Sequence, residues 1–314
     1  MLEQLLQEFY QGSKVAAARI ITMVENDTPA GREILKQLYH KGGRGYIVGL
    51  TGPAGSGKST LTDALVKLLR QQDYRVGVVA VDPTSPFTGG ALLGDRVRMG
   101  DLALDPGVFI RSMGTRGNLG GLSWAARDAL TVLDAFGCDF LFAETVGAGQ
   151  SQVDVERVAD TVVMVTVPGL GDDIQAAKAG IMEIGNIFVV NKADRGDADQ
   201  VVRYLQASLE MGRKDAAWQP PVLKTVAWQG TGVGDVLAAI LAHRRFLEQS
   251  GLLADLRQQR LKEEVMTRVE RMVLARLNGG VQTEAVLARV YNRELDPWTA
   301  AAGLLDNILG LKRE

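Results

Sequence analysis

Apolar residues in the first part of the chain recur every three or four positions, which is the spacing of amphipathic helices. The pattern over residues 2–9 predicts one helix, and the pattern over 15–24 predicts a second. A third helix is expected to begin at Thr28, where a threonine cap is followed by proline in the first turn. Glycines in the stretch 41–45 then predict a flexible joint.

Beyond this joint, short apolar runs alternate with helical stretches. Several runs are almost continuous in Val, Ile and Phe, as expected for strands that are buried on both faces. The helical stretches between them indicate βαβ crossovers, so we predict an α/β fold with a mostly parallel, doubly wound sheet. The seven predicted strands are 46–50, 76–81, 108–111, 140–143, 162–167, 187–190 and 222–226.

After Gly234 the pattern is helical again. One apolar stripe runs from Leu261 to Leu277 on a predicted long helix, which Asn278 and two glycines end. Two shorter helices follow, and the last is expected to open at Asp296. We therefore predict an N-terminal helical extension, a central α/β domain and a C-terminal helical arm, with bounds 1–44, 45–250 and 251–314.

The composition of the chain argues against several classes of function. The 314 residues are 46% hydrophobic and 23% charged with a net charge of −2, so no basic excess points to nucleic acid or to an anionic membrane. No stretch has the length of a membrane span, and the N-terminus lacks the pattern of a signal peptide. A single cysteine, Cys138, excludes an internal disulfide and fits the cytoplasm, while His40 and His243 lie too far apart in sequence to suggest a metal site.

The segment 52–59 matches the phosphate-loop pattern in full, between a predicted strand and a predicted helix. Its glycines let backbone N–H groups turn toward phosphate oxygens, and the helix N-terminus adds partial positive charge. Lys58 is expected to reach the β and γ phosphates, Ser59 to face Mg²⁺, and Thr60 to contact the α phosphate. The expected nucleotide-binding residues of this loop are Gly52, Pro53, Ala54, Gly55, Ser56, Gly57, Lys58, Ser59 and Thr60.

Carboxylates at the ends of two further strands predict a magnesium site. A strand delivers Glu144 at its carboxyl end, and Gly147 follows where its N–H would sense the γ phosphate. Asp82 ends another strand, and Asp95 follows in the sequence, although residue type alone favours a helix cap or a surface position for Asp95. With Ser59, these oxygen ligands suit Mg²⁺, and Lys58, Glu144 and Asp82 are the expected catalytic residues.

A second motif, Asn191-Lys-Ala-Asp, follows a predicted strand and indicates guanine. Asp194 can accept hydrogen bonds from N1–H and the 2-amino group of guanine, a donor pair that adenine lacks. Lys192 would lie along the base, and Asn191 would tie neighbouring loops together. One strand later, backbone N–H groups at Val226, Ala227 and Trp228 are expected near guanine O6, although Trp228 could be a core or rim aromatic instead.

Together these motifs resemble the MeaB-type GTPases, which older annotation calls LAO/AO transport-system kinases and which serve cobalamin-dependent methylmalonyl-CoA mutase. The resemblance covers nearly the whole chain, and its most specific pieces are the segments 82–99, 144–151 and 171–180. It implies a SIMIBI-type G domain, a Mg²⁺ shell that includes Asp82, Asp95 and Glu144, and a cytoplasmic homodimer. It also implies an additional switch loop that relays nucleotide state to the mutase through Asp172, Asp173, Gln175 and Lys178.

The implied function is GTP hydrolysis that gates adenosylcobalamin delivery to the mutase and protects or reactivates that enzyme. Two departures matter: Ala148 stands where many GTPases have a water-positioning glutamine, and Val226-Ala-Trp stands where the family more often has Ser-Ala. The first predicts slow intrinsic hydrolysis that a partner accelerates. No cobalamin-ligand motif is present, so direct binding of the cofactor is not expected.

Other functions remain open. A transport-linked kinase would need an acceptor site and a catalytic base, and neither is found as a motif. A GTPase that inserts nickel or zinc would need clusters of cysteine or histidine. An ATP-driven partitioning or scaffold protein conflicts with Asp194, which selects guanine. The apolar stripe from Leu261 to Leu277 could pair two chains or pack back on its own G domain.

Overall fold

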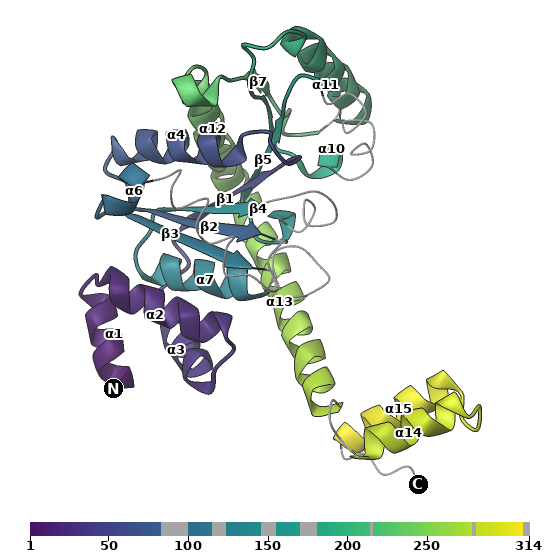
Figure 1. Cartoon of the computed structure of the whole chain (residues 1–314). Helices are drawn as coiled ribbons and strands as arrows, with labels where there is room; N and C mark the ends of the chain where they lie inside the picture. Colours follow the sequence, from purple (N-terminus) through teal and green to yellow (C-terminus); the bar gives the residue numbers. More distant parts are fainter. Residues whose placement is uncertain are drawn as a thin grey trace. The chain divides into compact units, whose positions relative to one another are not determined.

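The computed structural model describes residues 1–82, 100–114, 124–145, 155–169, 181–213, 216–277 and 281–309. They form two compact units, Met1–Leu253 and Ala254–Glu314. Figure 1 shows the sheet of the first unit with helices on both of its faces. The second unit consists of helices.

Seven strands form one sheet in which every neighbouring pair is parallel, and the order is β3-β2-β4-β1-β5-β6-β7. This confirms the predicted α/β fold. All seven predicted strands are present, with ends displaced by at most a few residues. They are β1 (Tyr46–Thr51), β2 (Val76–Asp82), β3 (Val108–Gly114), β4 (Phe140–Thr145), β5 (Thr161–Thr166), β6 (Ile187–Val190) and β7 (Val222–Lys224).

Alternating side chains of the strands supply three core clusters, two of which lie on opposite faces of β2. In β2, Val79 and Val81 face the helices α1–α3 and α7, whereas Val76 and Val78 face α4 and α12. Both sets are nearly inaccessible to solvent, which explains the continuous apolar runs in the sequence. The helices of the two layers are α4 (Lys58–Arg70), α7 (Trp124–Ala135) and α12 (Val233–Ser250), with α11 (Ala198–Arg213) against β6 and β7.

Three N-terminal helices extend the layer formed by α7. They are α1 (Leu2–Tyr10), α2 (Lys14–Glu25) and α3 (Pro29–Tyr39), and they belong to the first compact unit. Small residues bring α2 close to α7, because Ala16 and Ala17 pack in the same core as Ala126 and Ala129. As predicted, Thr28 caps α3: its Oγ1 accepts from the backbone N–H of Gly31 at 3.0 Å.

Short elements connect the larger ones. These are α6 (Gly100–Leu104), α10 (Ile181–Ile184) and the 3-10 turns η1 (Val155–Arg157) and η2 (Ala227–Gln229). Cys138 lies in the core of the first unit, and burial raises the pKa of its thiol to about 12. The thiol therefore stays protonated near neutral pH, as expected of a small buried hydrophobe. No described helix is long and apolar enough to cross a membrane.

The second unit contains most of α13 (Leu252–Leu277), with α14 (Val281–Tyr291) and α15 (Pro297–Leu309). The oxygen Oδ1 of Asp296 accepts from the backbone N–H groups of Trp298 and Thr299, which caps α15 where the sequence predicted it. No residue of α13 is buried in the single chain. The predicted stripe is exposed, with fractions of 42% at Leu261, 49% at Val269 and 64% at Met272.

A histidine is buried inside the first unit. His243 of α12 is 2% exposed, packs against the rings of Trp218 and Phe246, and places Nδ1 2.8 Å from Oγ1 of Thr161. Burial lowers the pKa of its imidazole to about 4, and the negative charge of Asp160 only partly opposes this shift. His243 is therefore neutral in the folded protein at physiological pH.

The neutral His243 predicts a specific pH dependence of stability. Between pH 6.5 and 4 the unfolded chain binds a proton at this position and the folded chain does not, so the free energy of unfolding falls as pH decreases through this window. The loss should approach roughly 3 kcal/mol by pH 4. Urea unfolding at a series of pH values measures it. His243→Phe should flatten the pH dependence relative to the original chain, and equal slopes in both proteins would contradict the assignment.

Candidate functional site

The phosphate-loop residues connect β1 to α4 at the carboxyl end of the sheet. Gly52 has φ +139°, and a Cβ there would lie 2.0 Å from the carbonyl oxygen of Val165 on β5. Gly57 has φ +89°, and a Cβ there would lie 2.3 Å from Nδ2 of Asn191. These two positions require glycine both for the backbone conformation and for close approach. The loop is thus packed directly against β5 and against the first residue of the base motif.

Lys58 is held inside this loop. Its Nζ donates to the carbonyl oxygens of Gly52 at 2.8 Å and Pro53 at 3.0 Å, and the residue is only 5% exposed. Burial lowers the pKa of the ammonium, and the nearby carboxylate of Glu144 opposes this shift. The structure therefore places a buried cation within the loop, with its charge partly balanced by the carboxylate of Glu144.

The side chain of Glu144 reaches the phosphate loop from the neighbouring strand β4. In register, it lies beside Leu50 of β1 and Ala80 of β2. Its oxygen Oε1 accepts from Oγ of Ser59 at 2.5 Å, and Oε2 accepts from Oγ1 of Thr62 at 3.2 Å. The carboxylate is buried, at 1% exposure. The sheet thus brings Lys58, Ser59 and Glu144 together, as the sequence predicted.

Thr62 was not among the predicted residues. It lies four positions after Lys58, one turn along the same face of α4, and its single hydroxyl hydrogen is shared between Glu144 and the carbonyl oxygen of Lys58, which is 3.0 Å from Oγ1. The four-residue spacing between Lys58 and Thr62 on a helix was therefore the sequence signal that could have identified Thr62. Thr62 holds the second oxygen of Glu144 and so fixes the orientation of that carboxylate.

Several predicted residues are only partly described or lie outside the described ranges. Asp82 is the last residue of β2, opposite Gly114 of β3, and only its backbone is described. Within the described residues, no group of three or more His, Cys, Asp or Glu side chains is arranged to hold a metal ion. The positions outside the described residues are Asp95, Gly147, Asp172, Asp173, Gln175 and Lys178.

Asn191 joins the phosphate loop to the base loops. Its Nδ2 donates to the carbonyl oxygen of Ser56 at 2.9 Å. Its Oδ1 accepts from Oγ1 of Thr225 at 3.0 Å and from the backbone N–H of Ala227 at 3.1 Å. Asn191 is 2% exposed, so all three bonds are protected from water. Thr225 is a second residue that sequence reasoning missed, because no motif marks the position before Val226.

The remaining residues of the base motifs flank Asn191. Lys192 has φ +56°, and its Nζ donates to the carbonyl oxygen of Gly55 at 2.7 Å. Asp194 is exposed on the turn that follows. In the next loop Val226 and Ala227 are buried, whereas Trp228 is 69% exposed. Trp228 is thus a surface aromatic and not a core residue.

Comparison with known proteins identifies this arrangement. The family model described as methylmalonyl Co-A mutase-associated GTPase MeaB matches residues 17–282. The chain belongs to this family. A putative GTPase of Pyrococcus abyssi is 49% identical, covering 99% of this chain and 98% of that protein. The mouse protein named methylmalonic aciduria type A homolog, mitochondrial, is 32% identical, covering 87% of this chain and 70% of that protein.

A solved structure has a similar fold. The crystal structure of an LAO/AO transport system kinase has a TM-score of 0.73 and 28% identity, and the similarity covers 98% of this chain and 97% of that one. The predicted family and its SIMIBI-type G domain are therefore confirmed. As a member of this family, the chain is a P-loop GTPase that binds GTP and GDP and hydrolyses GTP.

Proposed function

We propose that GTP hydrolysis by this chain gates the loading of adenosylcobalamin into a cobalamin-dependent acyl-CoA mutase and protects or reactivates that enzyme. The names of the family and of the mouse relative support methylmalonyl-CoA mutase as the client. The structural observation that carries the nucleotide part of the proposal is Asn191, which bonds the phosphate loop on one side and the base loop on the other. In this proposal, nucleotide binding at one loop affects the conformation of the other loop through the side chain of Asn191.

The phosphate half of the site is assigned as follows. Backbone N–H groups of residues 52–60 bind the phosphates, and Lys58 places its positive charge beside them. The donor set of Ser59 and Glu144 fits Mg²⁺, because both are oxygen ligands already in contact within the site. Asp82 and Asp95 would complete the ligand set. When bound, Mg²⁺ supplies positive charge that stabilises the phosphates.

The hydrogen bonds that hold Glu144 also affect nucleotide binding in this assignment. Since Ser59 and Thr62 both donate to it, the carboxylate is fixed before a nucleotide binds. A fixed carboxylate does not lose side-chain freedom when the site fills, so less binding free energy is spent on ordering it. Gly147 would contact the γ phosphate, and Asp172, Asp173, Gln175 and Lys178 would relay its loss to the mutase.

The base half recognises guanine through Asp194. Its exposed carboxylate is available for the N1–H and 2-amino donors of the base. Lys192 lies along the base plane, tied back to Gly55 of the phosphate loop. Backbone N–H groups of Val226, Ala227 and Trp228 would lie near O6. The exposed ring of Trp228 suits a position at the rim of this pocket.

Two alternatives are weaker. A metal-insertion GTPase would need a soft-ligand site, but the only cysteine is buried and protonated, and the buried His243 is bonded to Thr161. A kinase in amino-acid transport matches the name of the similar crystallised protein, but no acceptor site is identified among the described residues. The cytoplasm is the proposed location, consistent with a single reduced cysteine.

We also propose a homodimer formed through the arm that begins near residue 251. In the single chain, apolar residues of α13 are half exposed over several turns, which is costly in water unless a second chain covers them. Light scattering on a chain that ends at Ser250 tests this proposal. The full chain should measure as a dimer and the shortened chain as a soluble monomer, whereas a dimer of the shortened chain would refute the assignment.

Asp194→Asn should change base specificity without disturbing the phosphate half of the site. The amide offers a donor and an acceptor, which match the 2-oxo and N1–H groups of xanthine instead of the two donors of guanine. We expect GDP affinity to fall at least a hundredfold, about 3 kcal/mol, while xanthosine diphosphate gains affinity. Calorimetric titration measures both. Retention of full GDP affinity by the variant would show that Asp194 does not read the base.

The client proposal is tested by GTP turnover with and without methylmalonyl-CoA mutase of the same organism. We expect the mutase to raise turnover at least tenfold, about 1.4 kcal/mol of transition-state stabilisation. Lys178→Ala should keep the basal rate within a few fold and lose the stimulation, because Lys58 and Ser59 are unchanged. A basal rate that the mutase leaves unaltered would contradict the client, and would leave the GTPase activity itself standing.

A further inference from the structure

A buried serine on strand β3 carries a hydroxyl group that makes no hydrogen bond with any described residue. Ser112 is only 6% exposed, so its Oγ is also shielded from bulk solvent. Burying a hydroxyl without a partner costs free energy, and such groups in folded proteins are typically matched to a ligand, an ion or an ordered water. We therefore expect the partner of Ser112 in the ligand-bound protein.

The register of the sheet places Ser112 in one row with Glu144. Ala80 of β2 lies beside Ser112 on one side and beside Glu144 on the other. Residues that lie side by side on neighbouring strands point to the same face of a sheet. Ser112 therefore points toward helix α4, whose Ser59 and Thr62 hydrogen-bond to the carboxylate of Glu144.

The other side chains of β3 agree with this orientation of Ser112. Val108 belongs to the core on the α4 side of the sheet, and Ile110 packs against that core. Arg111, at the alternate position, pairs with Glu25 of α2 on the opposite face. Because side chains along a strand alternate with a period of two, Ser112 shares the α4 side with Val108 and Ile110.

Ser112 lies too far from Glu144 to bond it directly. Neighbouring strands are about 4.8 Å apart, and β2 lies between β3 and β4, so the two residues are separated by about 10 Å. The residue between them, Ala80, has a single methyl group as its side chain. A larger side chain at this position would fill the space between the hydroxyl and the carboxylate, and alanine does not.

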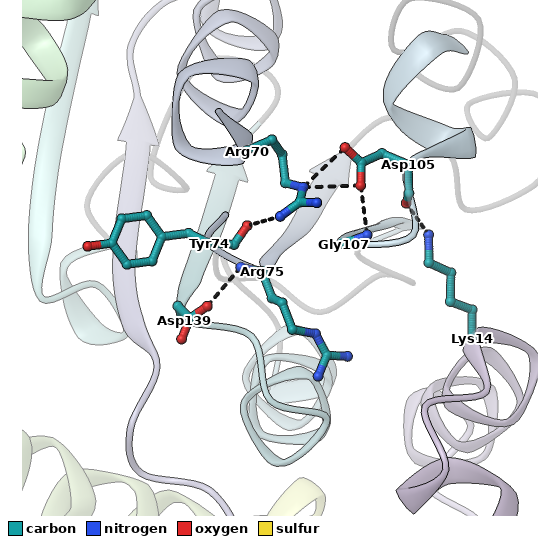
Figure 2. Close-up of polar contacts among 7 residues, drawn as sticks. All are labelled: Lys14, Arg70, Tyr74, Arg75, Asp105, Gly107 and Asp139. Carbon is teal, nitrogen blue, oxygen red and sulfur yellow. Dashed lines mark hydrogen bonds and ion pairs between the residues drawn. The ribbon is translucent and has the colours of Figure 1, made fainter. Parts of the chain in front are cut away.

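Polar groups at the opposite, amino ends of β2, β3 and β4 find partners within the chain. Figure 2 shows Nε of Arg70 in contact with both carboxylate oxygens of Asp105 at 3.1 Å. It also shows the backbone N–H of Arg75 donating to the carboxylate of Asp139 at 2.7 Å. The unpaired hydroxyl of Ser112 lies near the other end of the same strands, where the phosphate loop and Glu144 lie.

We propose that Ser112 is a positioning residue of the magnesium site, and that its hydroxyl accepts a hydrogen bond from a water molecule bound to the ion. Mg²⁺ keeps several waters when a protein binds it, and groups that hydrogen-bond to the ligands of a metal strengthen its binding. A neutral hydroxyl can accept from such a water without adding charge beside Lys58 and Glu144. This inference rests on the magnesium assignment in the proposed function and adds a residue of β3 to it.

The test measures how strongly magnesium retains GDP on the full chain. Release of a fluorescent GDP analogue is followed over a series of Mg²⁺ concentrations and in EDTA, and release from the original chain should slow as Mg²⁺ increases. In Ser112→Ala, the Mg²⁺ concentration that gives half of this effect should rise by about tenfold or more. GDP affinity in EDTA should equal that of the original chain, because the phosphate loop and Asp194 are unchanged.

Urea unfolding separates this role from a purely structural one. Since Ser112→Ala removes a buried hydroxyl that has no partner in the empty protein, its midpoint in EDTA should equal or exceed that of the original chain. Mg²⁺ and GDP together should then raise the midpoint of the variant less than that of the original chain. A lower midpoint in EDTA, with an equal gain from Mg²⁺ and GDP, would show a structural hydroxyl and reject the proposal.

Two further variants serve as controls. Ser112→Thr keeps a hydroxyl in a residue that suits a strand, so it should retain most of the magnesium affinity that Ser112→Ala loses. Thr166→Val is the matched control, because Thr166 is 3% exposed and its Oγ1 also has no partner among the described residues. Thr166 lies beside Val190, which packs in the core cluster of α11 on the other face of the sheet. Its loss should leave the magnesium dependence unchanged.

The outcomes distinguish this inference from the assignment on which it rests. A magnesium dependence of Ser112→Ala that equals that of the original chain, or equal effects of Ser112→Ala and Thr166→Val, would overturn the role of Ser112 alone. If GDP release from the original chain does not respond to Mg²⁺, the magnesium assignment fails and the inference fails with it.

Discussion

The side-chain amide of Asn191 is the contact that holds the three loops of the proposed nucleotide site together. Its nitrogen holds the carbonyl of Ser56, and its oxygen holds Thr225 and the backbone of Ala227. The phosphate loop follows β1, and the two base loops follow β6 and β7, so no local interaction keeps them together. The buried amide of Asn191 keeps these loops together with three hydrogen bonds, which involve both its nitrogen and its oxygen. Gly57 is required beside it because any side chain there would collide with the amide.

The parallel sheet makes this arrangement possible. Since all strands run in one direction, their carboxyl ends meet at one edge, and β1, β4 and β6 deliver Lys58, Glu144 and Asn191 there. Among the described residues, the phosphate and base motifs lie away from the first half of β3. Lys14 and Arg111 attach the N-terminal helix α2 to β3 and to the turn before it.

The sequence predicted the strands and the phosphate loop well, because these depend on local apolar runs and on glycine spacing. It also placed Lys58, Ser59 and Glu144 at one edge. It missed Thr62 and Thr225, whose roles arise from contacts across the fold: Thr62 orients Glu144 from α4, and Thr225 reaches Asn191 from the next loop. It also left the position of Trp228 open, because an aromatic residue fits a core or a rim equally well in a linear pattern.

Calorimetric titration of GDP into Asn191→Ala tests the central claim most directly. The alanine removes the bonds to Ser56, Thr225 and Ala227 while leaving Lys58, Ser59 and Asp194 in the sequence. If one amide couples the phosphate and base halves, GDP affinity should fall at least tenfold, about 1.4 kcal/mol, although no direct ligand of the nucleotide has changed. An affinity for GDP equal to that of the original chain would contradict the account.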